Sequence, residues 1–112
     1  MPRDYRVYLE DILEAIGKIT RYTAGLSLKT FSEDSKTLDA VVRNLEVVGE
    51  AIKNVPDGVR LRYPAVDWRR IAGLRDILVH EYFGIDVQII WDIVTSKLPD
   101  LERQIWQILK DG

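Results

Sequence analysis

The sequence predicts an all-α fold, an up-down bundle of four to five helices that forms a single domain over residues 1–112. Apolar residues recur at spacings of three and four along most of the chain, which is the period of a helix with one buried face. No segment alternates apolar and polar residues as a half-buried strand does. A chain of 112 residues is long enough to bury one core but too short for two domains.

The first half of the chain predicts two long helices and a connector. The first helix begins near Asp4 and frays around residues 24–25, and residues 26–34 form a connector with room for one helical turn. The second begins at Asp34 or Ser35, since either side chain can cap its first turn. The expected core faces are Leu9, Ile12, Leu13, Ile16 and Ile19, then Leu38, Val41, Leu45, Val48 and Ile52.

The opposite stripe of the second helix is charged and has two interpretations. The simpler one is a solvated face with ion pairs three and four residues apart. The other gives Arg43, Glu46 or Glu50 a place in the wall of a site or in an interface. The stripe consists of Asp39, Arg43, Glu46, Glu50 and Lys53.

Helix breakers divide the second half of the chain. Residues 56–58 end the second helix, and Pro64 closes a short segment after them. Asp67 caps a third main helix that starts at the next residue, residues 84–86 supply a break and a new cap, and Pro99 interrupts again. The expected core sides are Ile71, Leu74 and Leu78; Val87, Ile90, Trp91 and Val94; and Leu101, Ile105, Ile108 and Leu109.

Composition excludes several classes of protein. The chain has no cysteine, which excludes disulfides and thiolate metal sites and suits a reducing cytoplasm. No segment approaches the ~18 apolar residues that a membrane span needs, and the first six residues do not resemble a signal peptide. One histidine and scattered carboxylates make a poor metal-binding set, so we expect no metal and no cofactor.

Charge is unevenly distributed. The whole chain has a formal charge of −2, which argues against a protein that coats nucleic acid by charge alone. Residues 53–75 nevertheless carry six basic side chains against two acidic ones. Such a section favours an anionic substrate, with Arg69 and Arg70 as candidate substrate-binding residues; alternatively, it is a solvated basic loop and helix face.

Residues 75–82, RDILVHEY, are the strongest candidate for chemistry because they contain the only histidine of the chain. An imidazole titrates near ~6.5, so His80 can give or take a proton at neutral pH. Arg75 stays charged and can hold a phosphate through its planar fork. Together these residues predict phosphate chemistry.

Helical geometry indicates where these side chains project. At about 100° per residue, His80 lies about 180° from Ile71 on a continuous helix, away from the core and on the side of Gly73. That small residue suits close contact with a ligand or a second subunit. Asp76, four residues before His80, orients the imidazole or is a plain surface pair.

Arg75 and His80 do not meet automatically, because five residues place them about 140° apart. The arginine reaches round, the helix loosens after His80, or the two residues come from different subunits. Metal-independent RNA cleavage needs a base for the 2′-hydroxyl, an acid for the 5′-oxygen and cations for the phosphorane. A two-fold dimer would bring two copies of each residue to one cleft. Tyr82 either packs at the core edge or is exposed before Gly84.

The chain resembles the HEPN superfamily, and within it the HepT-like ribonuclease toxins of prokaryotes. The signature is an arginine, four to six residues, a histidine and, in the HepT branch, a tyrosine two residues later; Arg75, His80 and Tyr82 match it. The similarity extends over five blocks in order: DILEAI at 11–16, YTAGL at 22–26, RNLEVVGEA at 43–51, WRRIAGLR at 68–75 and HEYFGID at 80–86.

The resemblance implies a helical homodimer with Arg75 and His80 in a cleft between subunits, where RNA is cut without metal. It also implies a partner, a minimal nucleotidyltransferase antitoxin of the MntA type, which transfers AMP from ATP onto Tyr82. The added negative charge and bulk would compete with RNA phosphate.

Two other functions stay open from the sequence. One is a non-catalytic module whose Arg/His face holds a nucleotide or serves as the regulatory subunit of a nucleotidyltransferase. The other is a plain helical interaction protein in which His80 is a surface residue.

Overall fold

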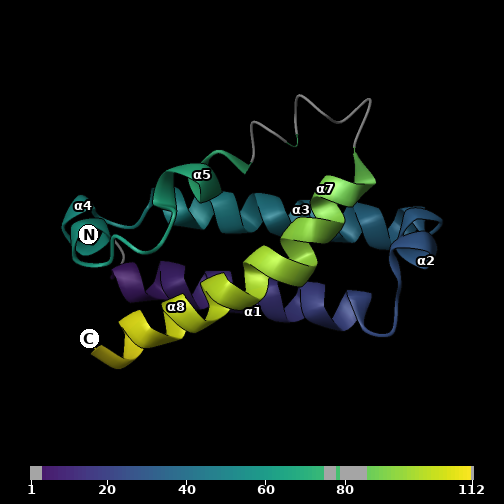
Figure 1. Ribbon diagram of the computed structural model, residues 1–112. Coiled ribbons are helices and arrows are strands. Elements are labelled where there is room, and N and C mark those ends of the chain that lie inside the picture. Colours follow the sequence, from purple (N-terminus) through teal and green to yellow (C-terminus); the bar gives the residue numbers. More distant parts are fainter. Residues whose placement is uncertain (1–3, 75–77, 79–85, 112) are drawn as a thin grey trace.

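The computed structural model describes residues 4–74, 78 and 86–111. All regular secondary structure in these residues is helical, which confirms the all-α prediction (Figure 1). The elements are α1 (Tyr5–Thr23), α2 (Leu28–Ser32), α3 (Ser35–Lys53), α4 (Asp57–Arg62), α5 (Trp68–Ala72), α7 (Val87–Asp92), the π-helix η1 (Ile93–Lys97) and α8 (Leu98–Asp111).

Helices α1 and α3 form an antiparallel pair, and each starts where the sequence predicts (Figure 1). The Asp4 side chain accepts a hydrogen bond from the backbone N–H of Arg6 at 3.0 Å. Of the two candidate caps for α3, Asp34 takes the role by accepting from the N–H of Thr37 at 3.0 Å. The apolar stripes predicted for the two helices face each other and are mostly buried.

The connector between these helices contains the single helical turn that the sequence allowed. Ser27 and Thr30 cap it reciprocally, each side chain accepting from the other residue's backbone N–H. This turn places the Phe31 side chain in the core, fully buried, with its ring centroid 5.0 Å from that of Trp91. The connector therefore contributes to the core as well as joining two helices.

The prediction that Pro99 interrupts the C-terminal half is wrong. Helices α7, η1 and α8 follow one another without a gap, as one bent rod (Figure 1). A proline ring collides with the carbonyl four residues earlier in a regular α-helix. Here the preceding turn is a π-turn, in which the Leu98 N–H donates to the carbonyl of Ile93, five residues back. The wider turn lets Pro99 enter α8 as its second residue.

The predicted third main helix is interrupted where the sequence expected it to continue. Helix α5 ends at Ala72, and the N–H of Gly73 is shared between the carbonyls of Arg69 and Arg70, each 3.1 Å away. Glycine is a poor helix former, by about 1 kcal/mol relative to alanine. Leu74 and Leu78 are helical and buried, as predicted. The projection angles given above for residues after Gly73 assumed an unbroken helix, and the break at Gly73 removes that assumption.

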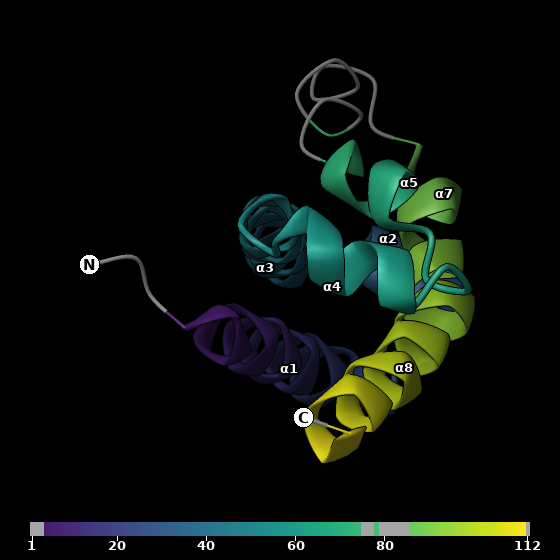
Figure 2. The same cartoon turned by 90° about the vertical axis from the view of Figure 1, so that its left-hand side faces the viewer.

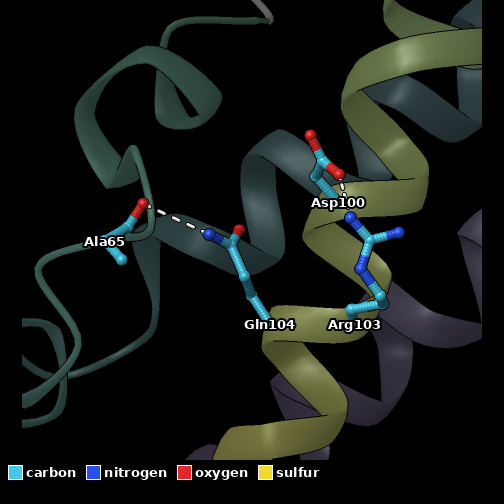
Figure 3. Close-up of polar contacts among 4 residues, drawn as sticks. All are labelled: Ala65, Asp100, Arg103 and Gln104. Atoms are coloured by element: carbon cyan, nitrogen blue, oxygen red, sulfur yellow. Dashed lines mark hydrogen bonds and ion pairs between the residues drawn. The ribbon is translucent and has the colours of Figure 1, made fainter.

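Long-range hydrogen bonds attach the segment before α5 to α8. The Tyr63 hydroxyl donates to an Asp111 carboxylate oxygen at 2.9 Å, and the Gln104 amide donates to the carbonyl of Ala65 at 3.2 Å (Figure 3). Figure 2 shows α1, α3 and the α7–α8 rod around a common interior, with α4 and α5 beside them. The segment that leads into α5 is therefore attached to α8 by two hydrogen bonds.

Candidate functional site

The residues predicted to carry chemistry fall into two groups. Arg75, Asp76, His80 and Tyr82 lie outside the described residues, whereas the candidate substrate-binding residues of α5 are described. The described elements nearest to the motif are α5, which precedes it in the chain, and α7, which follows it.

Helix α5 is firmly anchored just before the motif. The Asp67 carboxylate accepts from the N–H of Arg70 at 3.3 Å and caps the helix, as predicted. The Trp68 side chain is buried, and its indole N–H donates to the carbonyl of Tyr63 at 3.0 Å. Leu74, the residue immediately before Arg75, is also buried. The chain thus enters the motif directly after a buried residue.

Arg69 and Arg70 are both exposed but line different hollows. Arg69 lies on a hollow of about 520 Å³ between α4 and α5. Arg70 lines a groove on the other side of α5, and its Nε lies 3.4 Å from a carboxylate oxygen of Asp67. The structure does not bring the two arginines together into one cationic site, and their role in substrate binding stays a prediction.

Part of the basic section between residues 53 and 75 has a structural role. The Arg60 guanidinium donates to the carbonyls of Ile52 at 2.7 Å and Val55 at 3.0 Å, at the C-terminal end of α3. The Arg62 guanidinium carbon lies 5.9 Å from the centroid of the Tyr63 ring. Sequence reasoning missed the role of Arg60; a cation shortly after a helix end was the available signal.

A second hollow, the α5/α8 groove, lies between α5 and the rod of α7, η1 and α8. Its volume is about 440 Å³. Its polar edge includes Gln104, bonded to Ala65, and Asp100, paired with Arg103 (Figure 3). The apolar lining consists of Ile71, Leu74, Ile89, Ile93, Leu98 and Leu101.

The charged face of α3 is exposed to solvent, as the simpler interpretation predicted. Arg43, Val47 and Glu50 are exposed, and with Glu46 they line an open hollow of about 410 Å³. This arrangement leaves room for the second interpretation, in which the same side chains form part of an interface.

One carboxyl group and one phenol group among the described residues have shifted pKa values. Hydrogen bonds from the hydroxyl and then the N–H of Thr37 lower the pKa of Asp34. Partial burial, followed by the hydrogen bond to Asp111, raises the pKa of Tyr63. Both groups stabilise the fold, and neither lies in one of the hollows.

The part of the chain that the structure describes contains no cluster of side chains that could bind a metal ion. No three His, Cys, Asp or Glu side chains converge there as a metal ion would require. No helix in the same residues is long and apolar enough to cross a bilayer.

Comparison with known proteins identifies the family. The family model described as "Ribonuclease HepT-like" matches residues 12–108, a range that includes the whole stretch from Arg75 to Tyr82. The chain belongs to the HepT-like ribonuclease family. The resemblance stated from the five sequence blocks is confirmed, and so is the enzyme class, because the family is one of ribonucleases.

Relatives of this HepT-like chain match it over nearly their full lengths. "Putative RNase MJ0127" of Methanocaldococcus jannaschii is 47% identical over 99% of this chain and 93% of its own. "Putative RNase TTE0752" of Caldanaerobacter subterraneus is 42% identical over 94% of each chain. "Probable ribonuclease HepT" of Thermococcus cleftensis is 41% identical over 98% of this chain and all of its own. No solved structure gives a significant match.

Proposed function

We propose that this chain is the toxin of a prokaryotic toxin-antitoxin system, a metal-independent endoribonuclease that acts in the cytoplasm as a homodimer. The observation that carries the proposal is the family match, which spans residues 12–108 and contains the complete Arg75, His80 and Tyr82 motif. The names of the relatives, which are RNase or ribonuclease, support the same reaction class.

The chemistry of the motif provides each step of RNA cleavage. One His80 takes the proton of the 2′-hydroxyl, whose oxygen attacks the adjacent phosphorus. The second His80 of the dimer gives a proton to the leaving 5′-oxygen. Arg75 stabilises the negative charge of the phosphorane, and Asp76 orients the imidazole as a positioning residue. The products are a 2′,3′-cyclic phosphate and a free 5′-hydroxyl.

Neutralisation is proposed to act on Tyr82. A minimal nucleotidyltransferase would direct the deprotonated phenol oxygen onto the α-phosphorus of ATP, with pyrophosphate as the leaving group. The adenylyl group adds a negative charge two residues from His80. Such a group would repel RNA phosphate and obstruct the cleft.

Cleavage of RNA by purified protein, with EDTA present, tests the catalytic assignment. We expect His80→Ala and Arg75→Ala to lower the rate by about 10²–10⁴-fold, because each removes a transition-state contact. Arg21→Ala, which removes an exposed arginine at the end of α1, outside the three hollows, is the matched control and should leave the rate unchanged. Growth arrest by His80→Ala as strong as by the unmodified chain would show the assignment to be wrong.

Intact-mass measurement tests the role of Tyr82. After incubation with ATP and the nucleotidyltransferase, the chain should gain the mass of one or more AMP groups, and Tyr82→Phe should gain none. An adduct that persists in Tyr82→Phe removes this residue from the switch. Tight nucleotide binding or complex formation without RNA turnover by the purified chain would instead favour the non-catalytic regulatory subunit.

A further inference from the structure

The hollow between α4 and α5 combines charged side chains with exposed apolar surface. This α4/α5 hollow is lined by Asp57, Arg60 and Leu61 of α4 and by residues 66–69, and its volume is about 520 Å³. Leu61 is 80% exposed, more than any other large apolar side chain that the structure describes. An apolar side chain left in water at the edge of a hollow favours contact with a ligand.

The charges of the α4/α5 hollow favour an anion. Its lining has two arginines and two aspartates, but one aspartate is already paired. Asp67 accepts from the backbone N–H of Arg70 and lies 3.4 Å from the Nε of the same residue. Asp57 is then the remaining acid, against Arg60 and Arg69. The net charge at the hollow is therefore positive.

Arg69 is the cation of this hollow that is open to a ligand. It is exposed, and in the part of the chain that the structure describes its side chain has no hydrogen-bond or ion-pair partner. Arg60 differs, because its guanidinium donates to the carbonyls of Ile52 and Val55 and so contributes charge with fewer available donors. An unpaired guanidinium can bind two oxygens of one phosphate through parallel N–H groups.

Further cations flank the α4/α5 hollow in the chain. Lys53 is the last residue of α3 and Arg62 the last of α4, and both are exposed. Residues 53–74 carry five basic side chains against two acidic ones, although the whole chain has a formal charge of −2. Concentrated positive charge binds a nucleic-acid backbone, because each neutralised phosphate releases its counterions.

The apolar part of the lining favours RNA over a free phosphate ion. A phosphate ion gains nothing from the exposed Leu61 side chain. Single-stranded RNA places bases with accessible faces between its phosphates. One strand can therefore use both the cation and the apolar surface of the hollow.

The α4/α5 hollow is also close to the catalytic motif along the chain. Arg69 precedes Arg75 by six residues, so chain length alone keeps their Cα atoms within about 22 Å of each other. The buried Leu74 lies between them in the chain. An RNA strand that is cut at the motif can thus continue to the hollow.

We infer that the α4/α5 hollow binds the RNA strand beside the bond that is cut, with Arg69 on a phosphate and Leu61 against a base or ribose. The inference rests on the proposed function and gives the same substrate a second contact. Arg69 binds substrate and moves no proton. Because such a contact is equally strong in the bound substrate and in the transition state, it lowers KM and leaves kcat unchanged.

Steady-state cleavage of a long single-stranded RNA by the full chain tests the contact. We expect Arg69→Ala and Leu61→Ser each to raise KM by about three- to tenfold at constant kcat. Arg69→Lys keeps the charge and should restore most of the affinity. Arg21→Ala, outside the three hollows, should change neither constant. An unchanged KM in Arg69→Ala, a fall in kcat alone, or an equal rise in KM for Arg21→Ala overturns the inference.

The salt dependence of RNA binding separates a phosphate contact from a change in folding. A strand with 2′-O-methyl groups has no 2′-hydroxyl to attack, so its binding to the full chain can be followed by fluorescence anisotropy without cleavage. Loss of one phosphate contact in Arg69→Ala should make the log–log slope of affinity against salt shallower by about 0.7. The same slope in Arg69→Ala and the unmodified chain contradicts the phosphate contact.

Protection of a single thiol locates the strand without removing Arg69. The chain has no cysteine, so Leu61→Cys introduces a unique thiol at the α4/α5 hollow. The 2′-O-methyl strand should slow alkylation of this thiol by iodoacetamide several-fold. Trp106→Cys is the control, because Trp106 is also exposed, at 57%, but lies on α8. Equal protection of the two thiols, or none at position 61, contradicts the proposed path of the strand.

The two measurements distinguish this inference from the proposed function. Cleavage of RNA with an unchanged KM in Arg69→Ala leaves the ribonuclease assignment intact and removes the contact at the hollow. Protection of the Leu61→Cys thiol by RNA, in a chain that cleaves no RNA under any condition, retains the hollow and removes the ribonuclease assignment.

Discussion

Arg60 shows how a single side chain can join two elements. Its guanidinium reaches from α4 to carbonyls at the end of α3, where the last carbonyls of a helix have no partner within the helix. The negative end of the helix dipole adds to the attraction. This cation therefore fastens the α3–α4 turn.

The Asp34 carboxylate predicts a weak dependence of stability on acid. Its pKa is lowered in the folded state, so its contribution is fully present above the unfolded value near ~3.9 and is lost as the pH falls through the folded value. We expect the melting temperature of the unmodified chain to fall more steeply between about pH 5 and about pH 2 than that of Asp34→Asn. Asp39→Asn, on the same helix, is the control; identical slopes for the unmodified chain and Asp34→Asn would refute the role of this cap.

At the scale of elements, Gly73 is the residue that follows the last residue of α5 and caps its C-terminal end. A Cβ atom added there would lie 3.4 Å from the carbonyl oxygen of Arg70 and 3.5 Å from that of Arg69, which are ordinary contacts. Gly73→Ala should therefore raise the free energy of unfolding by about 0.5–1 kcal/mol, as measured by urea denaturation. Gly25→Ala is the contrasting variant, because a φ of 77° strains any residue with a Cβ, and it should be destabilising. A loss of stability in Gly73→Ala would mean that the break itself is needed.

The elements that the sequence predicted correctly depend on signals within a few residues. Asp67 and Asp86 cap helices where they were expected to, Asp34 was one of two named candidates, and the first helix starts near Asp4 as predicted. Pro99 misled because its effect depends on the turn before it, and a π-turn has no recognisable sequence pattern. The break at Gly73 was missed because one glycine inside an apolar pattern is usually tolerated.

At the scale of the whole molecule, the stability of the fold depends on the packing of the rod formed by α7, η1 and α8 against the other helices. Ile105 of α8 is fully buried, whereas its neighbour Trp106 is 57% exposed. We expect Ile105→Ala to lower the free energy of unfolding by about 2–4 kcal/mol, because it leaves a cavity in the core. Trp106→Ala should cost less than about 1 kcal/mol despite removing a larger side chain. Urea unfolding of both variants measures the difference, and equal losses would contradict the buried position of α8.

The residues of the candidate site differ in what supports them, because some are predicted from the sequence alone and others are also described by the structure. Arg75, His80 and Tyr82 were found from the motif alone, because the family signature is local in sequence; the family match covers their positions, and their roles stay predictions. The two arginines of α5 were grouped together because they are adjacent in the chain, yet they line hollows on different sides of the helix. Adjacent helical residues point about 100° apart, so proximity in sequence did not give a shared surface.

The sequence by itself determined the helical fold class, the helix caps, the buried stripes and the family, since each follows from short periodic patterns or from the order of motifs along the chain. Only the tertiary structure decided that the chain continues through Pro99, that Arg60 closes α3, and that α5 and the distant rod enclose a groove. The groove comes from contacts between residues far apart in the chain, whereas Pro99 and Arg60 depend on hydrogen bonds between residues five to eight positions apart, which helical periodicity does not predict. Helical periodicity shows which face of each element is buried but not which element covers it.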